Sequence, residues 1–150
     1  GILLGWGIPI EVAINELEKL DSVDGRMSQL GGGLKPKVVI DYAHTPDALE
    51  KALSSLREHT QKKLICVFGC GGDRDTGKRP IMGEIASRLA DQIFLTNDNP
   101  RNENAQVIIK QIKKGIKANS NLVIEEDRKK AITKAIFGAE KGDLVLVAGK

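Results

Sequence analysis

The amino-acid sequence predicts an α/β fold, a doubly wound and mainly parallel sheet of about five to six strands with helices on both faces. Short apolar segments carry this prediction, because they are continuous rather than alternating, and that pattern is typical of strands buried on both faces. Amphipathic segments with helical spacing separate them, so predicted strands and helices alternate along the chain. The five apolar segments are residues 38–40, 64–68, 93–95, 122–124 and 144–148.

Four helices are predicted between these strands from apolar residues at positions i, i+3, i+4 and i+7. The first helix follows Thr45 and Pro46, residues that are typical of an N-cap and of the first helical position. The predicted buried faces are Leu49, Ala52, Leu53 and Leu56; Ile81, Ile85, Ala86 and Leu89; Ala105, Ile108, Ile109, Ile112 and Ile116; and Ala131, Ile132, Ala135, Ile136 and Ala139.

Residues 1–34 do not follow this repeat. Three glycines at positions 31–33, with a proline soon after, predict a linker. At the other end, residues 149–150 stop where the last strand would deliver a loop. We therefore expect a fragment of a longer protein, with the end of one domain and a linker over residues 1–34 and a second, truncated domain over 35–150. One further amphipathic helix is predicted from Ile10, Ala13, Ile14 and Leu17.

The composition argues against several classes of protein. With 41% hydrophobic and 29% charged residues, the 150-residue chain is close to the globular average. The net charge is only +3 and aromatic residues make up 3%, whereas nucleic-acid sites combine clustered Lys and Arg with stacking aromatics. No apolar run approaches the roughly 18 residues of a membrane span. We expect neither nucleic acid nor membrane as a partner, and a cytoplasmic location.

The two cysteines do not form a redox or zinc motif. Cys66 and Cys70 are four residues apart, which is not the C-x-x-C spacing, and the chain has no second pair. We expect a reduced core thiol at Cys66 and a small loop residue at Cys70.

Polar and turn-forming residues follow the predicted strands. They occupy residues 41–47, 69–79, 97–101 and 149–150. Because the carboxyl ends of parallel strands meet at one edge of a sheet, where open α/β sheets bind their ligands, we expect these segments to form one site.

The second of these segments contains a near-match to a nucleotide-binding loop. Residues 72–78 fit G-x-x-x-x-G-K between a strand and a helix, but Arg79 follows where a Mg²⁺-binding hydroxyl belongs. Asp73 and Asp75 would also place negative charge beside a polyphosphate. We therefore favour an anion-binding loop at a helix N-terminus, with Arg74 available to hold a carboxylate. A glycine-rich turn with solvated charges remains the alternative.

The other segments offer rings and a guanidinium. Asp41, Tyr42 and His44 place a carboxylate and two rings at a strand end, which suits contacts to a nucleotide or to metal-bound water. His44 has no nucleophile at motif spacing, so we expect it to form hydrogen bonds or pack its ring. In the D-N-P-R run, Asn99 offers an amide and Arg101 a planar fork for a carboxylate. A plain β-turn would need the asparagine and proline but not the arginine.

Four motifs together carry a family resemblance. D-Y-A-H-T-P-D at 41–47, G-C-G-G-D-R-D with G-K-R-P at 69–80, D-N-P-R at 98–101 and V-A-G-K at 147–150 occur in order. They resemble the Mur ligases of peptidoglycan synthesis, above all those that add meso-diaminopimelate. The resemblance spans nearly the whole chain. It implies the end of a central ATPase domain, followed by a Rossmann-like C-terminal domain.

The resemblance implies an ATP-dependent amide ligase. ATP would phosphorylate the D-glutamyl carboxylate of UDP-N-acetylmuramoyl-L-alanyl-D-glutamate, and the amino group of meso-diaminopimelate would attack the acyl phosphate. ATP and Mg²⁺ would be bound mainly by a central domain that this chain lacks. We therefore expect this fragment to be inactive alone, with no catalytic residue or metal site of its own, and we expect the protein to be a monomer.

Residue by residue, the resemblance implies two sets of contacts. The nucleotide would be contacted by Arg26, Asp41, Tyr42 and His44. The incoming amino acid would be held by Arg74, Asp98, Asn99, Arg101 and Gly149. Family members continue after Lys150 with Gly-His-Glu, whose Glu contacts the ammonium group of the amino acid.

Two alternatives stay open at this point. One is a lysine-adding Mur ligase, which has other residues at the positions of Asn99 and Arg101. The second is a non-catalytic α/β module that binds an anion or a nucleotide.

Overall fold

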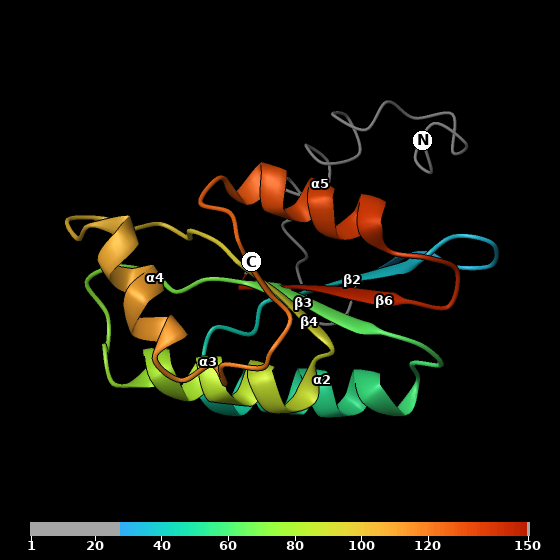
Figure 1. Ribbon diagram of the computed structural model, residues 1–150, viewed down its shortest axis with the longest axis horizontal. Coiled ribbons are helices and arrows are strands. Elements are labelled where there is room, and N and C mark those ends of the chain that lie inside the picture. The colour runs from blue at the N-terminus through green and yellow to red at the C-terminus, as the bar shows by residue number, and fades with distance from the viewer. Residues whose placement is uncertain (1–27, 150) are drawn as a thin grey trace.

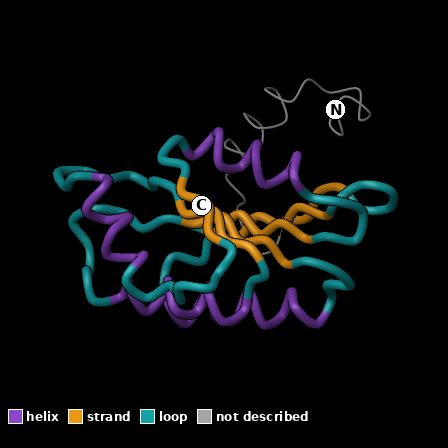
Figure 2. Tube along the Cα trace, viewed as in Figure 1, coloured by secondary structure: helices purple, strands orange, loops and turns teal. Residues whose placement is uncertain are grey.

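The computed structural model describes residues 28–149, and these form a three-layer α/β domain (Figures 1 and 2). The predicted helix with Ile10 and Leu17, and the predicted nucleotide contact Arg26, lie outside the described residues. The strands of the sheet are β1 (Ser28–Gly31), β2 (Lys37–Asp41), β3 (Leu64–Phe68), β4 (Gln92–Leu95), β5 (Leu122–Ile124) and β6 (Leu144–Ala148).

The order of strands across the sheet is β1-β2-β6-β3-β4-β5, and every neighbouring pair except β1 and β2 is parallel. Every residue of the central strands β3 and β6 is buried. Strands covered on both faces need apolar side chains on both, which explains the continuous apolar runs in the sequence. The predicted fold class is confirmed.

Strand β1 is the element that the sequence analysis missed. Ser28–Gly31 pairs antiparallel with β2, with Gly31 opposite Lys37. The predicted linker glycines therefore end this strand and form the turn into β2, and all three have positive φ angles, of 79°, 102° and 68°. A four-residue strand at the sheet edge contains no apolar run, so it left no signal. The domain boundary at residue 34 stays a prediction.

Helices cover both faces of the sheet, as predicted. They are α2 (Pro46–Glu58), α3 (Lys78–Leu89), α4 (Ala105–Lys113) and α5 (Arg128–Gly138). Helices α2 and α3 lie on one face and α5 lies on the other, and α4 lies beside α3 (Figure 1). One hydrophobic cluster joins α2, α3 and α4 to the sheet, and a second joins α5 to the opposite face.

The predicted buried face of α3 needs one correction. Ile81 is 49% exposed, whereas Arg79, two positions earlier, is fully buried. The residues that face the sheet are Met82, Ile85 and Ala86, and Ile81 lies at the exposed edge of this buried face. The apolar spacing fitted two neighbouring faces of this helix, and an arginine is not expected inside a core.

Side-chain caps fix the starts of α2 and α4, and Asp127 caps α5 in the same way. Thr45 Oγ1 accepts a hydrogen bond from the Ala48 amide at 3.2 Å, and Pro46 is the first residue of α2, as predicted. Asn104 Oδ1 accepts from the Gln106 amide at 2.8 Å at the start of α4. These caps hold the ends of the loops that follow β2 and β4.

Both cysteines are buried thiols. Burial raises the pKa of Cys66 to about 12 and that of Cys70 to about 11, so neither is a thiolate at neutral pH. The predicted core position of Cys66 is confirmed. Cys70 lies in a loop, where its Sγ is 3.7 Å from the Met82 sulfur.

Across residues 28–149, none of the helices combines the length and the hydrophobicity that a membrane span requires.

Candidate functional site

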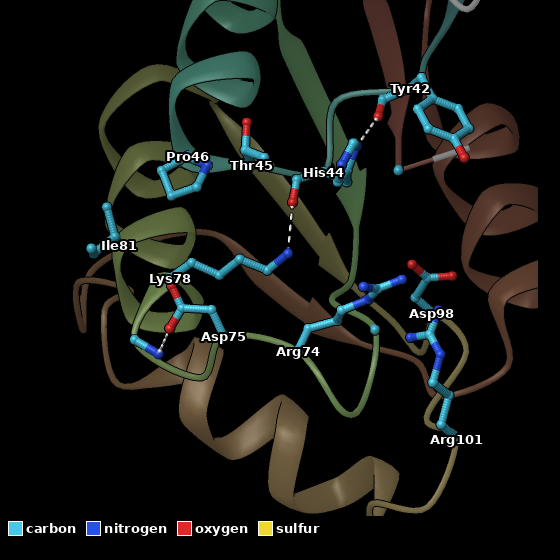
Figure 3. A pocket seen from close by; sticks show the side chains of 13 residues that line it. Tyr42, His44, Thr45, Pro46, Arg74, Asp75, Lys78, Ile81, Asp98 and Arg101 are labelled. Carbon is cyan, nitrogen blue, oxygen red and sulfur yellow. Dashed lines mark hydrogen bonds between the residues drawn. The ribbon is translucent and has the colours of Figure 1, made fainter.

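A pocket of about 790 Å³ opens at the carboxyl edge of the sheet. Its walls come from the loops after β2, β3 and β4 and from Gly149 after β6. These are the four segments that the sequence analysis expected to meet, and parallel topology is what brings them together. In Figure 3, Arg74, Asp98 and Arg101 lie at one end of the pocket, and Thr45, Pro46 and Ile81 lie at the other.

The loop after β2 presents two rings to the pocket. His44 Nδ1 is 2.9 Å from the carbonyl oxygen of Tyr42, and the two rings meet edge to face with centroids 5.4 Å apart. Asp41 does not line the pocket. Its Oδ1 accepts a hydrogen bond from the Ala43 amide at 2.8 Å, and its carbonyl accepts from the Gly149 amide at 3.0 Å. The carboxylate thus shapes the loop, while the rings face the ligand space.

The near-match to a nucleotide-binding loop has its polar groups engaged by protein. Asp75 Oδ1 accepts from the Gly77 amide at 2.8 Å, so a carboxylate already occupies a donor that a phosphate would need. Lys78 Nζ donates to the His44 carbonyl at 2.9 Å, which ties the start of α3 to the loop after β2. This arrangement supports the anion-binding or turn interpretation over a triphosphate-binding loop.

The opposite end of the pocket carries two arginines and one carboxylate. Arg74 and Arg101 come from the loops after β3 and β4, and Asp98 lies beside Gly149. Within residues 28–149, neither guanidinium forms an ion pair with a carboxylate. Planar guanidinium groups that lack a protein carboxylate are suited to bind the carboxylates of a ligand.

The D-N-P-R turn holds Arg101 in an unusual backbone conformation. Arg101 has a φ angle of 48°, in the left-handed region, and its amide donates to Asn99 Oδ1 at 3.1 Å. Its Nη1 donates to the Gly72 carbonyl at 2.7 Å, and the Gly72 amide donates to the Asn99 carbonyl at 2.8 Å. Asn99 itself lies outside the pocket lining, so in this structure its side chain supports the turn.

Sequence analysis overlooked two residues behind the pocket, Arg79 and Glu103. Arg79 was noted only because it replaces a hydroxyl residue after the glycine-rich loop. In the structure it is fully buried and forms an ion pair with Glu103 from the next loop. No local pattern joins residues 24 positions apart, so only the fold reveals this pair.

Together these observations define an α/β domain with a charged pocket at the carboxyl edge of its sheet. Residues 25–150 match the family model described as "Mur ligase, glutamate ligase domain", and the chain belongs to this family. The family predicted from the four motifs is therefore confirmed.

Curated relatives and solved structures agree with this assignment. The chain is 51% identical, over 99% of its length, to the UDP-N-acetylmuramoyl-L-alanyl-D-glutamate–2,6-diaminopimelate ligase of Nitrosomonas europaea. It is 52% identical, over 100% of its length, to the ligase of the same name from Pseudomonas aeruginosa. It spans 30% and 31% of these two relatives.

Two solved structures show how far the fold is shared. A structure of a ligase of the same name matches with a TM-score of 0.79 and 39% identity, over 97% of this chain and 30% of that one. A bifunctional folylpolyglutamate synthase/dihydrofolate synthase with Mn, AMPPNP and L-glutamate bound matches with a TM-score of 0.66. That match covers 87% of this chain and 30% of the other, and at 22% identity it shows the fold alone.

Proposed function

We propose that this chain is the amino-acid-binding domain of an ATP-dependent ligase that adds meso-diaminopimelate to UDP-N-acetylmuramoyl-L-alanyl-D-glutamate. The names of the relatives support this proposal, and one observation in the structure carries it. Arg74 and Arg101, neither paired with a carboxylate within residues 28–149, share one end of the pocket with Asp98. Two positive groups beside one negative group match a ligand that carries carboxylates and an ammonium group.

The charge pattern suits diaminopimelate better than lysine. Diaminopimelate has one more carboxylate than lysine, at the end remote from the attacking amine. If Arg101 and Arg74 bind that carboxylate, in a turn that Asn99 supports, lysine would leave both guanidinium groups without their partner. Such mismatches allow discrimination by about 10⁴–10⁵-fold in transition-state terms. This pocket therefore favours the diaminopimelate-adding ligases over the lysine-adding alternative.

In the proposed reaction, ATP transfers its γ-phosphoryl group to the D-glutamyl carboxylate, giving an acyl phosphate and ADP. The amine of diaminopimelate then attacks the acyl carbon, and phosphate leaves as the amide bond forms. The role of this domain is to bind the carboxylates so that the amine is oriented for attack, which makes the step effectively intramolecular. Gly149 and Asp98 border the same end of the pocket and complete the proposed amino-acid site.

The nucleotide is proposed to reach the other wall of the pocket. Tyr42 and His44 present their rings there, and Arg26 and Asp41 complete the proposed contacts, although Arg26 lies outside the described residues. Within residues 28–149, no three His, Cys, Asp or Glu side chains come together to hold a metal ion. We propose that Mg²⁺ and most of the triphosphate are bound by the part of the ligase that corresponds to the remaining length of the relatives. A reaction that uses ATP and a UDP-linked substrate belongs in the cytoplasm, and a monomeric state stays a prediction.

The test is a steady-state comparison of the full-length ligase and two variants, Arg101→Ala and Arg101→Lys, with each amino acid. Wild type should use meso-diaminopimelate and essentially ignore lysine. Arg101→Ala should cost about 2–5 kcal/mol, the range for truncating one partner of a hydrogen-bonded charge pair, if the bound amino acid buries the Arg101 guanidinium. That corresponds to a loss of about tens to thousands of fold in kcat/KM for diaminopimelate. Arg101→Lys should recover only part of this, because an ammonium group lacks the bidentate fork.

The control is Arg88→Ala on the outer side of α3, where Arg88 is paired with Glu50 and does not line the pocket. It should leave both amino-acid and ATP kinetics unchanged. Equal use of lysine by wild type, or unchanged diaminopimelate kinetics in Arg101→Ala, would show the assignment of this pocket to be wrong. If no amino acid stimulates ADP formation by the full-length protein supplied with the UDP-muramoyl dipeptide, that result would favour the non-catalytic binding module.

A further inference from the structure

We propose that the ion pair between the buried Arg79 and the partly exposed Glu103 is the positioning element of the amino-acid pocket, because it joins the loops after β3 and β4 into one unit. The proposal rests on the proposed function for its ligand, but its structural basis is independent of it. Neither residue lines the pocket. Both would act through Arg74 and Arg101, which do line it.

The pair has the geometry of a two-pronged contact. Arg79 Nη1 and Nη2 each donate to one carboxylate oxygen of Glu103, both at 2.8 Å. Arg79 is fully buried and the Glu103 side chain is 26% exposed. The hydrogen bonds from Arg79 lower the pKa of Glu103 to about 2, so the pair is charged across the physiological range. Charge-assisted, bidentate bonds of this kind are strong and define orientation as well as distance.

The same two side chains also bind the backbone of the loop after β3. Arg79 Nη2 donates to the Gly71 carbonyl at 3.1 Å, and Glu103 Oε1 accepts from the Asp73 amide at 2.6 Å. Arg79 Nη1 further donates to Gln111 Oε1 at 2.6 Å, on helix α4. Helix α3, both loops and helix α4 are thus joined at one buried point.

The ion pair binds the backbone on both sides of Gly72, the residue to which Arg101 donates a hydrogen bond. Gly72 lies between the two loop residues that the pair holds, and its carbonyl accepts from Arg101 Nη1 at 2.7 Å. A Cβ atom on Gly72 would lie 1.8 Å from the Pro100 carbonyl oxygen, and one on Gly71 would lie 2.8 Å from Arg101 Nη1. The two loops are therefore in contact at glycines, with no side chain of Gly71 or Gly72 between them. A small increase in the distance between the loops would move the Arg101 guanidinium.

Two residues in this unit adopt left-handed backbone conformations. Asp73 has a φ angle of 52° and Arg101 one of 48°, in a region that few residues other than glycine adopt and that arginine adopts less readily than aspartate. Such conformations persist only where the surroundings hold them. The Asp73 amide is held by Glu103, and its carboxylate accepts from the Asn102 side chain at 2.9 Å. Arg74 follows Asp73 directly, and Arg101 donates to Gly72. The ion pair therefore fixes the backbone position from which each of the two pocket arginines extends.

The experiment compares full-length wild-type ligase with Glu103→Gln and Arg79→Lys. Glutamine keeps the shape of Glu103 but loses its charge and one acceptor, and lysine keeps the charge of Arg79 but loses the fork. Arg88→Met is the matched control, because it breaks an exposed ion pair of the same helix far from both loops. Steady-state kinetics are measured well below the melting temperature of each variant, and amide hydrogen exchange is followed over residues 71–74.

Both pair variants should raise the KM for diaminopimelate at least about tenfold and leave the KM for ATP within about twofold. Exchange at the Gly72 and Asp73 amides should accelerate at least about tenfold, and the control should change neither readout. Unchanged KM with unchanged exchange would overturn the proposal. So would a variant with reduced stability and kcat but an unchanged KM, since that result indicates a purely structural pair.

A second variant and a separate criterion distinguish failure of this proposal from misfolding and from failure of the proposed function. If Glu103→Gln does not fold, Glu103→Asp, which keeps the charge but shortens the reach, should show the same selective rise in KM, and an unchanged KM there would overturn the proposal. If wild type shows no diaminopimelate-dependent ADP formation, the proposed function is wrong. The exchange comparison then still decides whether the pair holds the two loops together.

Discussion

Single hydrogen bonds decide what the glycine-rich loop can bind. Lys78 has the spacing of a phosphate-binding lysine, yet its Nζ donates to the His44 carbonyl at 2.9 Å. Asp75 likewise accepts from the Gly77 amide, a donor that a phosphate oxygen would otherwise use. At this scale the loop connects two walls of the pocket, and Arg74 is the residue of this loop that we propose to bind the ligand.

Replacing Lys78 by alanine tests this role. The isolated chain should bind ATP weakly and hydrolyse none, and Lys78→Ala should leave that behaviour unchanged, because the lysine is engaged with protein. Loss of its hydrogen bond should reduce the free energy of unfolding by about 0.5–1.5 kcal/mol. Calorimetry with ATP and chemical denaturation provide the two measurements. Micromolar affinity for ATP that disappears in Lys78→Ala would restore the triphosphate-binding interpretation.

Helix α3 packs closely against helix α4 and the residues that directly follow it. This packing positions Arg79, and with it the ion pair to Glu103. A Cβ atom on Gly83 would lie 2.2 Å from the Ile112 carbonyl oxygen, and one on Gly115 would lie 1.7 Å from the Pro80 carbonyl oxygen. These two glycines therefore allow backbone to approach backbone at both ends of the contact. Arg79 on α3 reaches Gln111 on α4 across the same interface.

Gly83→Ala should reduce the free energy of unfolding by about 1–3 kcal/mol, the usual cost of overpacking. Gly138→Ala is the control, because nothing lies within 4 Å of a Cβ atom there and its φ angle is not positive. That change should stabilise the domain by about 0.4–1 kcal/mol through the unfolded state. Urea denaturation of both variants measures the two effects. A Gly83→Ala variant as stable as wild type would contradict the close approach of the helices.

The pH dependence of stability belongs to the whole molecule, because it compares the folded with the unfolded chain. Glu103 has a pKa of about 2 when folded, below its value of about 4.3 in an unfolded chain. The unfolded chain therefore binds a proton more readily. The contribution of Glu103 to stability is complete above about pH 5 and is lost as the pH falls toward 2.

We expect wild type to lose stability between about pH 5 and pH 2 more steeply than Glu103→Gln, which cannot titrate at this position. The difference in unfolding free energy between the two proteins should shrink as the pH falls. Urea denaturation at a series of pH values provides the measurement, and Glu84→Gln, an exposed glutamate on α3, is the control. A difference that stays constant down to pH 2 would show that Glu103 is not held as a carboxylate by Arg79.

Local patterns were sufficient for most of the fold. Strands such as Leu64–Phe68 are covered on both faces and so must be apolar throughout, and that requirement is visible in any short window of sequence. Strand β1 was missed because an edge strand has no such requirement. The buried face of α3 was misplaced by Ile81, because its spacing also fits a helix face that borders the pocket.

The sequence by itself determined the fold class and the segments that meet at the carboxyl edge, because both follow from periodicity and from the rule that parallel strands end together. It also determined the family, through four motifs in order. Only the tertiary structure decided that Asp75 and Lys78 are engaged by protein, that Asn99 supports a turn, and that Arg79 and Glu103 join two loops. These are contacts between residues whose spacing along the chain carries no signal, because their geometry depends on how the loops close over the finished sheet.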